Sequence, residues 1–282
     1  MKVHYDVIGD IHGMGKTFRS MLASLGYGVQ SGRWFHPEGR ICVSVGDLLD
    51  RGPDPLGCLE IMSRMQRDGC GRMVLGNHEV NALHFSTTHR LTGQWLREHS
   101  EKNRVQFRST QSQISQDPSR WKELKEYLQT VPTHLELDEG KLRVVHACWG
   151  YNFLNAEDLP PNLNDADSLE RTADKAGGDI MYRAVECCIK GPEQPSESHK
   201  DKDGMLRTSV RVPWWETYPA TAPFVAFGHY WFSVEVGDRS QVPKFLGPGK
   251  NTVCLDFSLG KGGRVGVLRW PERQLLSFEC ID

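Results

Sequence analysis

The first stretch that could do chemistry comes where a short apolar run stops and a carboxylate and an imidazole follow, two residues apart. The run ending at Ile8 leads into Gly9-Asp10-Ile11-His12-Gly13. Side chains at i and i+2 of an extended chain point to the same side, so Asp10 and His12 can reach one point. An oxygen ligand beside a nitrogen ligand suits a borderline divalent metal such as Mn, Fe, Co or Zn. Asp-x-His also occurs in ordinary turns, so this motif needs companions.

Two further apolar runs end in a similar way. Residues 40–45 lead into Gly46-Asp47-Leu48-Leu49-Asp50-Arg51-Gly52, and residues 72–75 lead into Gly76-Asn77-His78-Glu79. These runs alternate with helical patterns, which predicts parallel crossover units. The carboxyl ends of parallel strands form one edge of a sheet, where ligands bind. We therefore expect the three motifs to converge on one site.

Two isolated histidines, His146 and His229, follow later predicted strands. A lone histidine at a strand end is more often a structural residue, and only the companion motifs favour ligation here. The candidate metal ligands are Asp10, His12, Asp47, Asn77, His146 and His229. Six such ligands exceed what one tetrahedral ion uses, whereas two ions can share one carboxylate, for which Asp47 is central. Two adjacent cations activate water and neutralise phosphoryl charge, which is the chemistry of phosphoester hydrolysis.

The combined motifs resemble a known family. Gly-Asp-x-His-Gly, Gly-Asp-x-x-Asp-Arg-Gly, Gly-Asn-His-Glu and two later histidines form the signature of calcineurin-like metallophosphoesterases. The match is closest to the phosphoprotein phosphatase branch, and the opening resembles small bacterial phosphatases that include diadenosine tetraphosphatase-like enzymes. The resemblance implies one metal on Asp10, His12 and Asp47. It implies a second metal on Asp47, Asn77, His146 and His229, with Mn favoured and Fe, Zn, Co and Ni as alternatives.

The same resemblance implies roles for residues that do not bind metal. His78 would protonate the leaving alkoxide and Asp50 would orient it, which agrees with the chemistry of an imidazole beside a carboxylate. Arg51 would clamp the phosphate, because the planar guanidinium binds two phosphoryl oxygens at once. A second phosphate-binding arginine is placed at Arg211, with Arg207 as its rival.

The expected fold is one α/β domain over residues 1–282, a metallophosphoesterase-type two-sheet β sandwich core flanked by helices. Residues 80–130 are polar and helix-prone and should form a helical cap, with Leu91 and Trp95 among its apolar anchors. Residues 150–223 should form an irregular insertion, in which the polar stretch 191–204 is expected to be a mobile loop. Trp214 and Trp215 fit core packing and an aromatic wall beside the substrate equally well.

Composition argues against several other classes of protein. The formal net charge of −2 predicts no general affinity for nucleic acid. Eight dispersed cysteines without a Cys-x-x-Cys pair indicate a reduced chain. There is neither an apolar leader pattern nor a run of membrane-spanning length, so a cytoplasmic protein without membrane contact is expected. Gly13-Met14-Gly15-Lys16-Thr17 is not a P-loop, because Asp10 stands where that motif needs glycine.

The expected function is that of a dinuclear metal-dependent phosphoesterase with a phosphorylated substrate, foremost a protein carrying phosphoserine or phosphothreonine. A dinucleoside polyphosphate hydrolase, such as a diadenosine tetraphosphatase, and a polynucleotide end phosphatase are the alternatives, since both would use the same ligands. A metal-bound scaffold without catalysis is a hypothesis of another class. It is disfavoured because neither a ligand nor the acid is missing.

Overall fold

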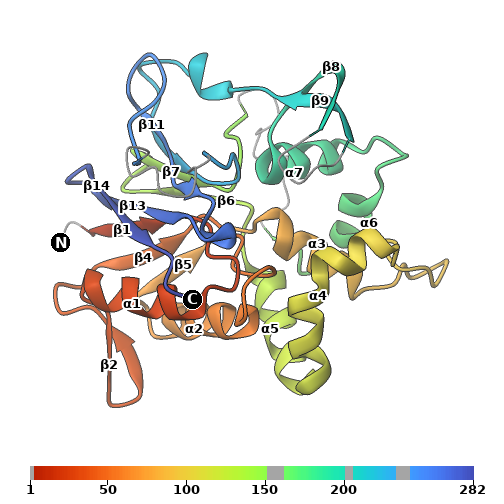
Figure 1. Ribbon diagram of the computed structural model, residues 1–282, viewed down its shortest axis with the longest axis horizontal. Helices are drawn as coiled ribbons and strands as arrows, with labels where there is room; N and C mark the ends of the chain where they lie inside the picture. Colours follow the sequence, from red (N-terminus) through yellow and green to blue (C-terminus); the bar gives the residue numbers. More distant parts are fainter. Residues whose placement is uncertain (1–2, 151–161, 201–205, 233–241) are drawn as a thin grey trace.

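The computed structural model describes residues 3–150, 162–200, 206–232 and 242–282, and its core is two β-sheets packed face to face (Figure 1). The strand order is β12-β13-β1-β4-β5 in the first sheet, where β14 also pairs with β13, and β11-β10-β7-β6 in the second. The strands of the first sheet are β1 (Tyr5–Ile8), β4 (Ile41–Ser44), β5 (Gly71–Met73), β12 (Asp256–Phe257), β13 (Arg264–Trp270) and β14 (Gln274–Glu279). Those of the second are β6 (His134–Leu137), β7 (Leu142–Val145), β10 (Phe224–Phe227) and β11 (Thr252–Cys254).

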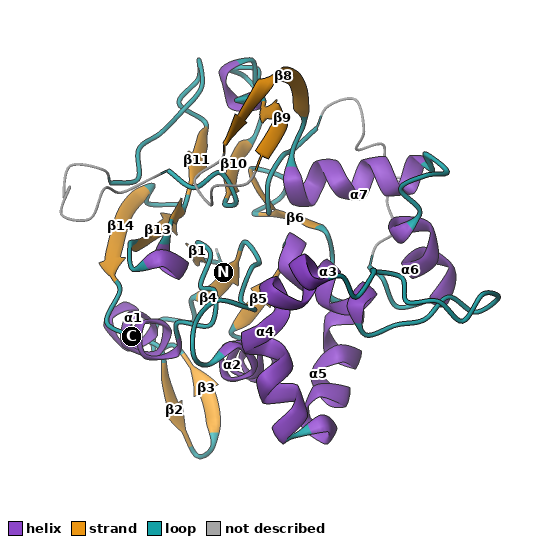
Figure 2. Ribbon diagram, turned by 45° about the vertical axis from the view of Figure 1, so that its right-hand side comes forward, coloured by secondary structure: helices purple, strands orange, loops and turns teal. Residues whose placement is uncertain are grey.

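Parallel crossovers build the half of the first sheet that carries the early motifs. Strands β1, β4 and β5 are parallel, and helices α1 (Gly15–Leu25) and α2 (Pro55–Arg67) connect them. Helix α1 buries residues at helical spacing, including Phe18, Met21 and Leu22, and ends at Gly26 in the left-handed region with φ of 103°. Both helices lie against the outer face of the first sheet (Figures 1 and 2). The predicted alternation is confirmed.

The inner faces of the two sheets form a continuous apolar core. Val7, Val43 and Val74 from the first sheet side pack with Val144 and Ala226 from the second. In the second sheet, β7, β10 and β11 are parallel, so the carboxyl ends of β7 and β10 lie at a common edge. The predicted two-sheet sandwich is therefore confirmed.

Three helices occupy the stretch expected to cap the site: α3 (Asn77–Phe85), α4 (Glu101–Gln116) and α5 (Pro118–Thr130). They form a group at one side of the sandwich (Figure 2). Trp121 of α5 is buried, but the expected anchor Leu91 is 91% exposed and the expected anchor Trp95 is half exposed. Those two expected anchors are wrong, because they lie in an irregular segment before α4 that presents no helical face to the core.

The region after residue 150 is more regular than its composition indicates. It holds α6 (Ala166–Ala173), α7 (Ile180–Lys190) and a hairpin of β8 (Glu193–Lys200) and β9 (Leu206–Arg211). The loop predicted over 191–204 is therefore wrong from 193 to 200, and 201–204 lie outside the described residues. A two-stranded hairpin pairs its own backbone groups, so it forms without an apolar face.

Smaller elements complete the fold. A hairpin of β2 (Gly28–Gln30) and β3 (Arg33–Phe35) precedes β4, and short 3-10 turns cover Trp214–Glu216 and Leu259–Lys261. Trp214 is buried and its indole N–H donates to the Ala147 carbonyl at 2.9 Å, so it is a core residue. Within the described ranges, none of the helices has the length and apolar character needed to cross a bilayer.

Candidate dinuclear metal centre

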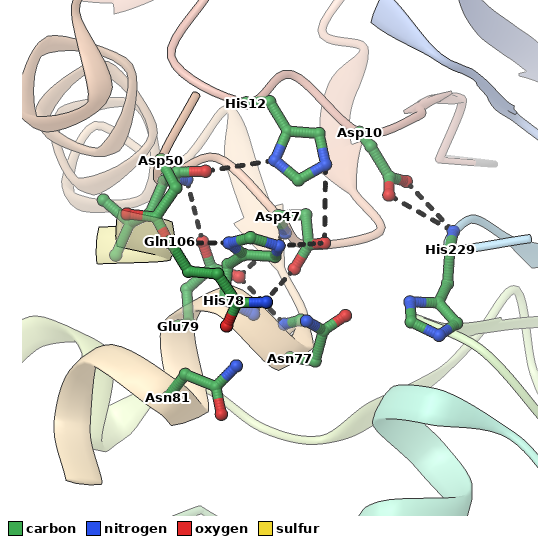
Figure 3. Close-up of polar contacts among 12 residues, drawn as sticks. Asp10, His12, Asp47, Asp50, Asn77, His78, Glu79, Asn81, Gln106 and His229 are labelled. Atoms are coloured by element: carbon green, nitrogen blue, oxygen red, sulfur yellow. Dashed lines mark hydrogen bonds and ion pairs between the residues drawn. The ribbon is translucent and has the colours of Figure 1, made fainter. Parts of the chain in front are cut away.

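The predicted ligands all lie just beyond the carboxyl ends of strands, and both sheets contribute (Figure 3). Two groups of side chains bring potential ligand atoms within 4.8 Å of one another: His12, Asp47 and His78 in one, and Asp47, His146 and His229 in the other. Asp47 belongs to both groups, which is the arrangement that a bridging carboxylate requires. The structure thus brings together residues separated by up to 217 positions, from His12 to His229.

The turns that present these side chains have unusual backbone geometry. His12, Asp47, Asp50, Arg51 and His229 all have positive φ, between 47° and 65°. An L-residue in the left-handed region costs of order 1–3 kcal/mol, and such residues cluster at functional sites because the surrounding structure holds them there. These residues follow the ends of β1, β4 and β10, and the turns there bring His12, Asp47 and His229 into the two ligand groups.

Glu79 holds one of these turns in place. Its buried carboxylate accepts hydrogen bonds from the backbone N–H groups of Asp47 at 2.8 Å, Leu48 at 2.9 Å, Leu49 at 3.1 Å and Gly76 at 3.0 Å. One side chain therefore joins the second motif to the third. Sequence analysis quoted Glu79 in its motif and assigned it no role; the signal was a Glu at the third position of a helix, the place of a capping box.

Hydrogen bonds to backbone carbonyls orient two of the histidines. The Nδ1–H of His12 donates to the Leu49 carbonyl at 3.1 Å, and that of His146 donates to the Val45 carbonyl at 2.8 Å. A carbonyl can only accept, so Nδ1 carries the proton and Nε2 is the atom left to bind a metal. The backbone thus selects the tautomer that ligation needs.

The donor set fits divalent cations. His12 Nε2 and His229 Nε2 are buried and have no hydrogen-bond partner. His146 Nε2 lies 3.2 Å from Asn77 Oδ1 and 3.4 Å from Asp47 Oδ2, an arrangement that calls for positive charge between the groups. Burial alone would lower the pKa of His146, but Asp47 outweighs it and raises the pKa to about 10. These residues would hold the metals that the family uses.

Asp10 lies at the junction of the two sheets. It accepts from the backbone N–H of His229 at 3.2 Å and is not a member of either three-residue group. Burial and the nearby carboxylate of Asp256 raise the pKa of Asp10 well above its usual value. Asp256, which sequence analysis missed, accepts from the N–H groups of Trp231 and Ser258. The ligand role of Asp10 stays a prediction.

His78 and Asp50 form a closely bonded pair, with 2.6 Å between His78 Nδ1 and Asp50 Oδ2. His78 Nε2 faces the site and lies 3.9 Å from Asp47 Oδ2. Burial disfavours the imidazolium, but Asp47 and Asp50 together outweigh burial and raise the pKa of His78. A histidine with this partner can hold a proton at Nε2 near neutral pH.

Helix α4 supports this pair through Thr110, which is buried. The Thr110 hydroxyl donates to Asp50 Oδ1 and accepts from the Asp50 N–H at 3.1 Å. Sequence analysis missed Thr110, since no motif joins residues 60 positions apart.

The two predicted phosphate clamps both contact the segment 229–231. The Arg51 guanidinium packs 4.4 Å from the centre of the Trp231 ring, and its Nε is buried without a hydrogen-bond partner. Arg211 donates from Nη1 to the His229 carbonyl at 3.1 Å, which places it beside the second ligand group. Arg207 lies in β9, but its side chain is outside the described residues.

A family model described as calcineurin-like phosphoesterase matches residues 3–229, and the chain belongs to that family. The protein is a metal-dependent phosphoric ester hydrolase, as the resemblance of its motifs implied. Among curated relatives, bis(5'-nucleosyl)-tetraphosphatase PrpE (asymmetrical) of Geobacillus thermodenitrificans is 28% identical over 98% of this chain and 94% of that protein. The protein of the same name from Halalkalibacterium halodurans is 30% identical over the same shares.

Solved structures share the fold. A putative diadenosine tetraphosphatase has a TM-score of 0.53 and 17% identity, covering 99% of this chain and 94% of that chain. A serine/threonine phosphatase from Saccharomyces cerevisiae has a TM-score of 0.53 and 13% identity, covering 100% of this chain and 81% of that one. At these identities the likeness establishes the architecture alone.

Proposed function

We propose that this phosphoesterase hydrolyses dinucleoside polyphosphates of the bis(5'-nucleosyl)-tetraphosphate type. The observation that carries the proposal is the likeness to the PrpE proteins, which extends over 98% of the chain and so includes α3, α4 and the region after residue 150. Sequence motifs alone placed phosphoserine and phosphothreonine first and dinucleoside polyphosphates second. The names of the curated relatives favour dinucleoside polyphosphates over phosphoserine and phosphothreonine.

The site supports hydrolysis of a phosphoanhydride in several ways. Asp10, His12 and Asp47 would hold one cation, and Asp47, Asn77, His146 and His229 the other. When bound, two such cations supply Lewis acidity that activates water and neutralises phosphoryl charge. Arg51 and Arg211, which contact Trp231 and the His229 carbonyl, bind non-bridging phosphoryl oxygens and so orient the phosphorus. His78, held by Asp50, gives a proton to the departing oxygen.

One observation favours phosphoserine or phosphothreonine as a second candidate substrate. The pKa of His78 is raised by carboxylate neighbours, which suits an acid that must protonate a strongly basic alkoxide. A nucleotide leaving through a phosphate oxygen needs that proton less. The acid pair therefore serves a protein phosphatase at least as well as a nucleotide hydrolase.

A panel of substrates tests the proposal. Protein loaded with Mn should have a higher kcat/KM for diadenosine tetraphosphate than for a phosphoserine peptide or a 5'-phosphorylated oligonucleotide, with ATP and AMP as products of an asymmetrical cleavage. Mn should support more activity than Mg, because imidazole ligands disfavour the harder ion. The Asp47→Asn variant, purified in the same way, measures the activity that comes from contaminating phosphatases. A clear preference for the peptide would overturn the proposal and leave the second candidate.

A further inference from the structure

A hollow opens beside the His78–Asp50 pair, on the side away from the second ligand group. The hollow is shallow, since its enclosed part has room for about one water molecule, and its polar wall is formed by Asp50, His78, Asn81, Arg97, Asn103 and Gln106. Figure 3 shows Asn81 and Gln106 on the side of His78 that is remote from His229. None of the expected metal ligands or phosphate clamps lines this hollow, and it adjoins the site only through His78 and Asp50.

The wall of the hollow comes mainly from α3 and α4. On α4, Asn103, Gln106 and Thr110 follow at i, i+3 and i+7 and so share one face. Asn81 lies on α3, about one helical turn after His78. The face of α4 that holds Asp50 through Thr110 therefore also borders the hollow.

Arg97 is the only basic side chain in this wall apart from the imidazole of His78. Its guanidinium donates to Asn81 Oδ1 at 2.6 Å, to Asn103 Oδ1 at 2.8 Å and to Gln106 Oε1 at 3.0 Å. All three partners are neutral amides, and no carboxylate of the described chain lies within ion-pair distance of it. Burial lowers the pKa of Arg97, which reflects the cost of placing a cation there. The carboxylates of Asp50 and Glu186 are near enough to favour the cation but lie beyond ion-pair distance, so the guanidinium is not paired with an anion and can bind one.

The direction of the reaction decides which part of the substrate meets Arg97. His78 delivers its proton to the departing oxygen, so the leaving group lies on the His78 side of the phosphorus. His78 and Asp50 line the hollow, so the leaving group extends into it. A serine leaving group brings no phosphate there. A nucleotide leaving group brings the phosphate next to the scissile one, with its negative charge.

We propose that the mouth of the hollow is a subsite for the phosphate next to the scissile one in the leaving nucleotide, and that Arg97 binds a non-bridging oxygen of that phosphate. This inference rests on the proposed function. In the reaction the water oxygen bonds to phosphorus, the bond from phosphorus to the bridging oxygen breaks, and the electron pair stays with the departing nucleotide. That oxygen takes the proton of His78, and the proton that the attacking water loses passes to the solvent, from which His78 is protonated again. Arg97 stabilises the phosphate that gains charge.

Removing the positive charge of Arg97 tests the subsite. For Arg97→Gln we expect kcat/KM for diadenosine tetraphosphate to fall about 10- to 100-fold, the usual effect of losing a charge-assisted hydrogen bond in the transition state. Hydrolysis of 4-nitrophenyl phosphate, whose leaving group has no phosphate, should change less than about threefold. Arg108→Gln, at an exposed position on α4, is the matched control for the loss of one positive charge. Equal losses on both substrates would overturn the subsite.

A second variant covers the case in which Arg97→Gln does not fold. Gln106 is exposed, so Gln106→Glu places a carboxylate against the guanidinium without removing a packed side chain. It should reproduce the selective loss, whereas Gln111→Glu, an exposed change of equal charge on α4, should not. Unchanged hydrolysis of diadenosine tetraphosphate by folded Gln106→Glu would overturn the role of Arg97.

An inhibition assay separates the subsite from the proposed function. If the wild-type protein does not hydrolyse diadenosine tetraphosphate, the proposed function fails whatever the variants do. The subsite is then tested by inhibition of 4-nitrophenyl phosphate hydrolysis at fixed free Mn. ATP should inhibit Gln106→Glu about tenfold more weakly than wild type, and inorganic phosphate should inhibit both equally. Equal inhibition by ATP would overturn the subsite as well.

Discussion

Three imidazoles converge on a single oxygen of Asp47. His146, His12 and His78 place Nε2 at 3.4, 3.7 and 3.9 Å from Asp47 Oδ2. Burial would raise the pKa of Asp47, but the neighbouring histidines outweigh it and lower the pKa well below its usual value. The carboxylate is therefore an anion at the point where both ligand groups meet.

Asp47→Asn should lose metal at both positions, because the neutral amide cannot bridge two cations, while His12→Ala should mainly empty one. The measurement is metal content per chain after loading with Mn and desalting. Asp167→Asn, an exposed carboxylate on α6, controls for non-specific loss. Retention of two ions in Asp47→Asn would place the bridge elsewhere.

His78→Asn should leave metal content intact and lower kcat by roughly 10²–10⁴-fold on an alkyl phosphate, the usual span for lost general acid catalysis. An aryl phosphate should suffer far less, because its phenolate leaves without a proton. Asp50→Asn should show a weaker form of the same pattern, since it acts through the imidazole. His78 also belongs to one of the two ligand groups. Loss of metal from His78→Asn would therefore show that His78 is a metal ligand and not the acid.

Among the elements, α4 has a role that its polarity does not indicate. It is mostly exposed, and its two buried residues are Phe107 and Thr110. Thr110 makes two hydrogen bonds with Asp50, so the orientation of the acid pair depends on how this helix packs. Helix α4 is thus joined to the acid pair by the hydroxyl group of Thr110.

Thr110→Val keeps the shape of the side chain and removes both hydrogen bonds, so kcat on an alkyl phosphate should fall about tenfold. Thr110→Ser keeps the hydroxyl and should restore most of the rate. Metal content and aryl phosphate hydrolysis should change little in either variant. If Ser behaved like Val, or if both substrates lost rate equally, the effect would come from packing and not from the acid pair.

The contact between α3 and α6 should respond to acid. His84 is buried and its Nε2–H donates to the Thr172 hydroxyl at 3.1 Å. Burial, with the nearby charges of Lys190 and Arg97, lowers the pKa of His84 from 6.5 to about 3. Between pH 3 and pH 6.5, therefore, the imidazole of His84 is protonated in the unfolded chain and neutral in the folded chain. Stability contributed by the neutral imidazole is present above pH 6.5 and lost as pH falls toward 3.

Between pH 7 and pH 5 the wild-type protein should lose about 2 kcal/mol more unfolding free energy than His84→Gln, which cannot titrate. Urea unfolding at the two pH values, with equal metal load, measures the difference. Comparing the two proteins cancels the acid sensitivity of the metal ligands. Parallel pH dependence in both would show that His84 is protonated in the folded state.

For the whole molecule, the metal centre joins the two sheets. His12, Asp47 and Asn77 follow strands of the first sheet, while His146 and His229 follow strands of the second. Buried carboxylates gather at this junction, including Asp10 and Asp256, and burial raises the pKa of both. Cations bound there would compensate this charge and hold the two layers together.

Chelation should therefore abolish activity and lower the Tm. Each ion present at a hundredfold excess over its Kd stabilises the folded state by about 2.7 kcal/mol, which corresponds to a Tm shift of about 5 °C or more. Differential scanning calorimetry of chelated and Mn-loaded protein measures it. The Asp47→Asn variant should respond weakly to the same treatment. Full activity after chelation and dialysis would contradict a metal-dependent hydrolase.

The sequence by itself determined the strand-end motifs, the parallel crossovers and the family. Each of these depends on residues close together in the chain, such as the apolar run before Asp10 or the helical spacing of Phe18 and Met21, where local geometry dictates the result. It also indicated that the ligands meet, because parallel strands share one edge.

Only the tertiary structure decided which groups surround those ligands. The bond from Thr110 to Asp50, the amides around Arg97, and the contact between Asp10 and Asp256 join distant or unpatterned residues. Likewise, Leu91 looked like an anchor and is exposed, while the polar stretch from 193 to 200 became a strand. Packing and backbone pairing between distant segments outweigh local preference at such positions, and no periodicity in the chain records them.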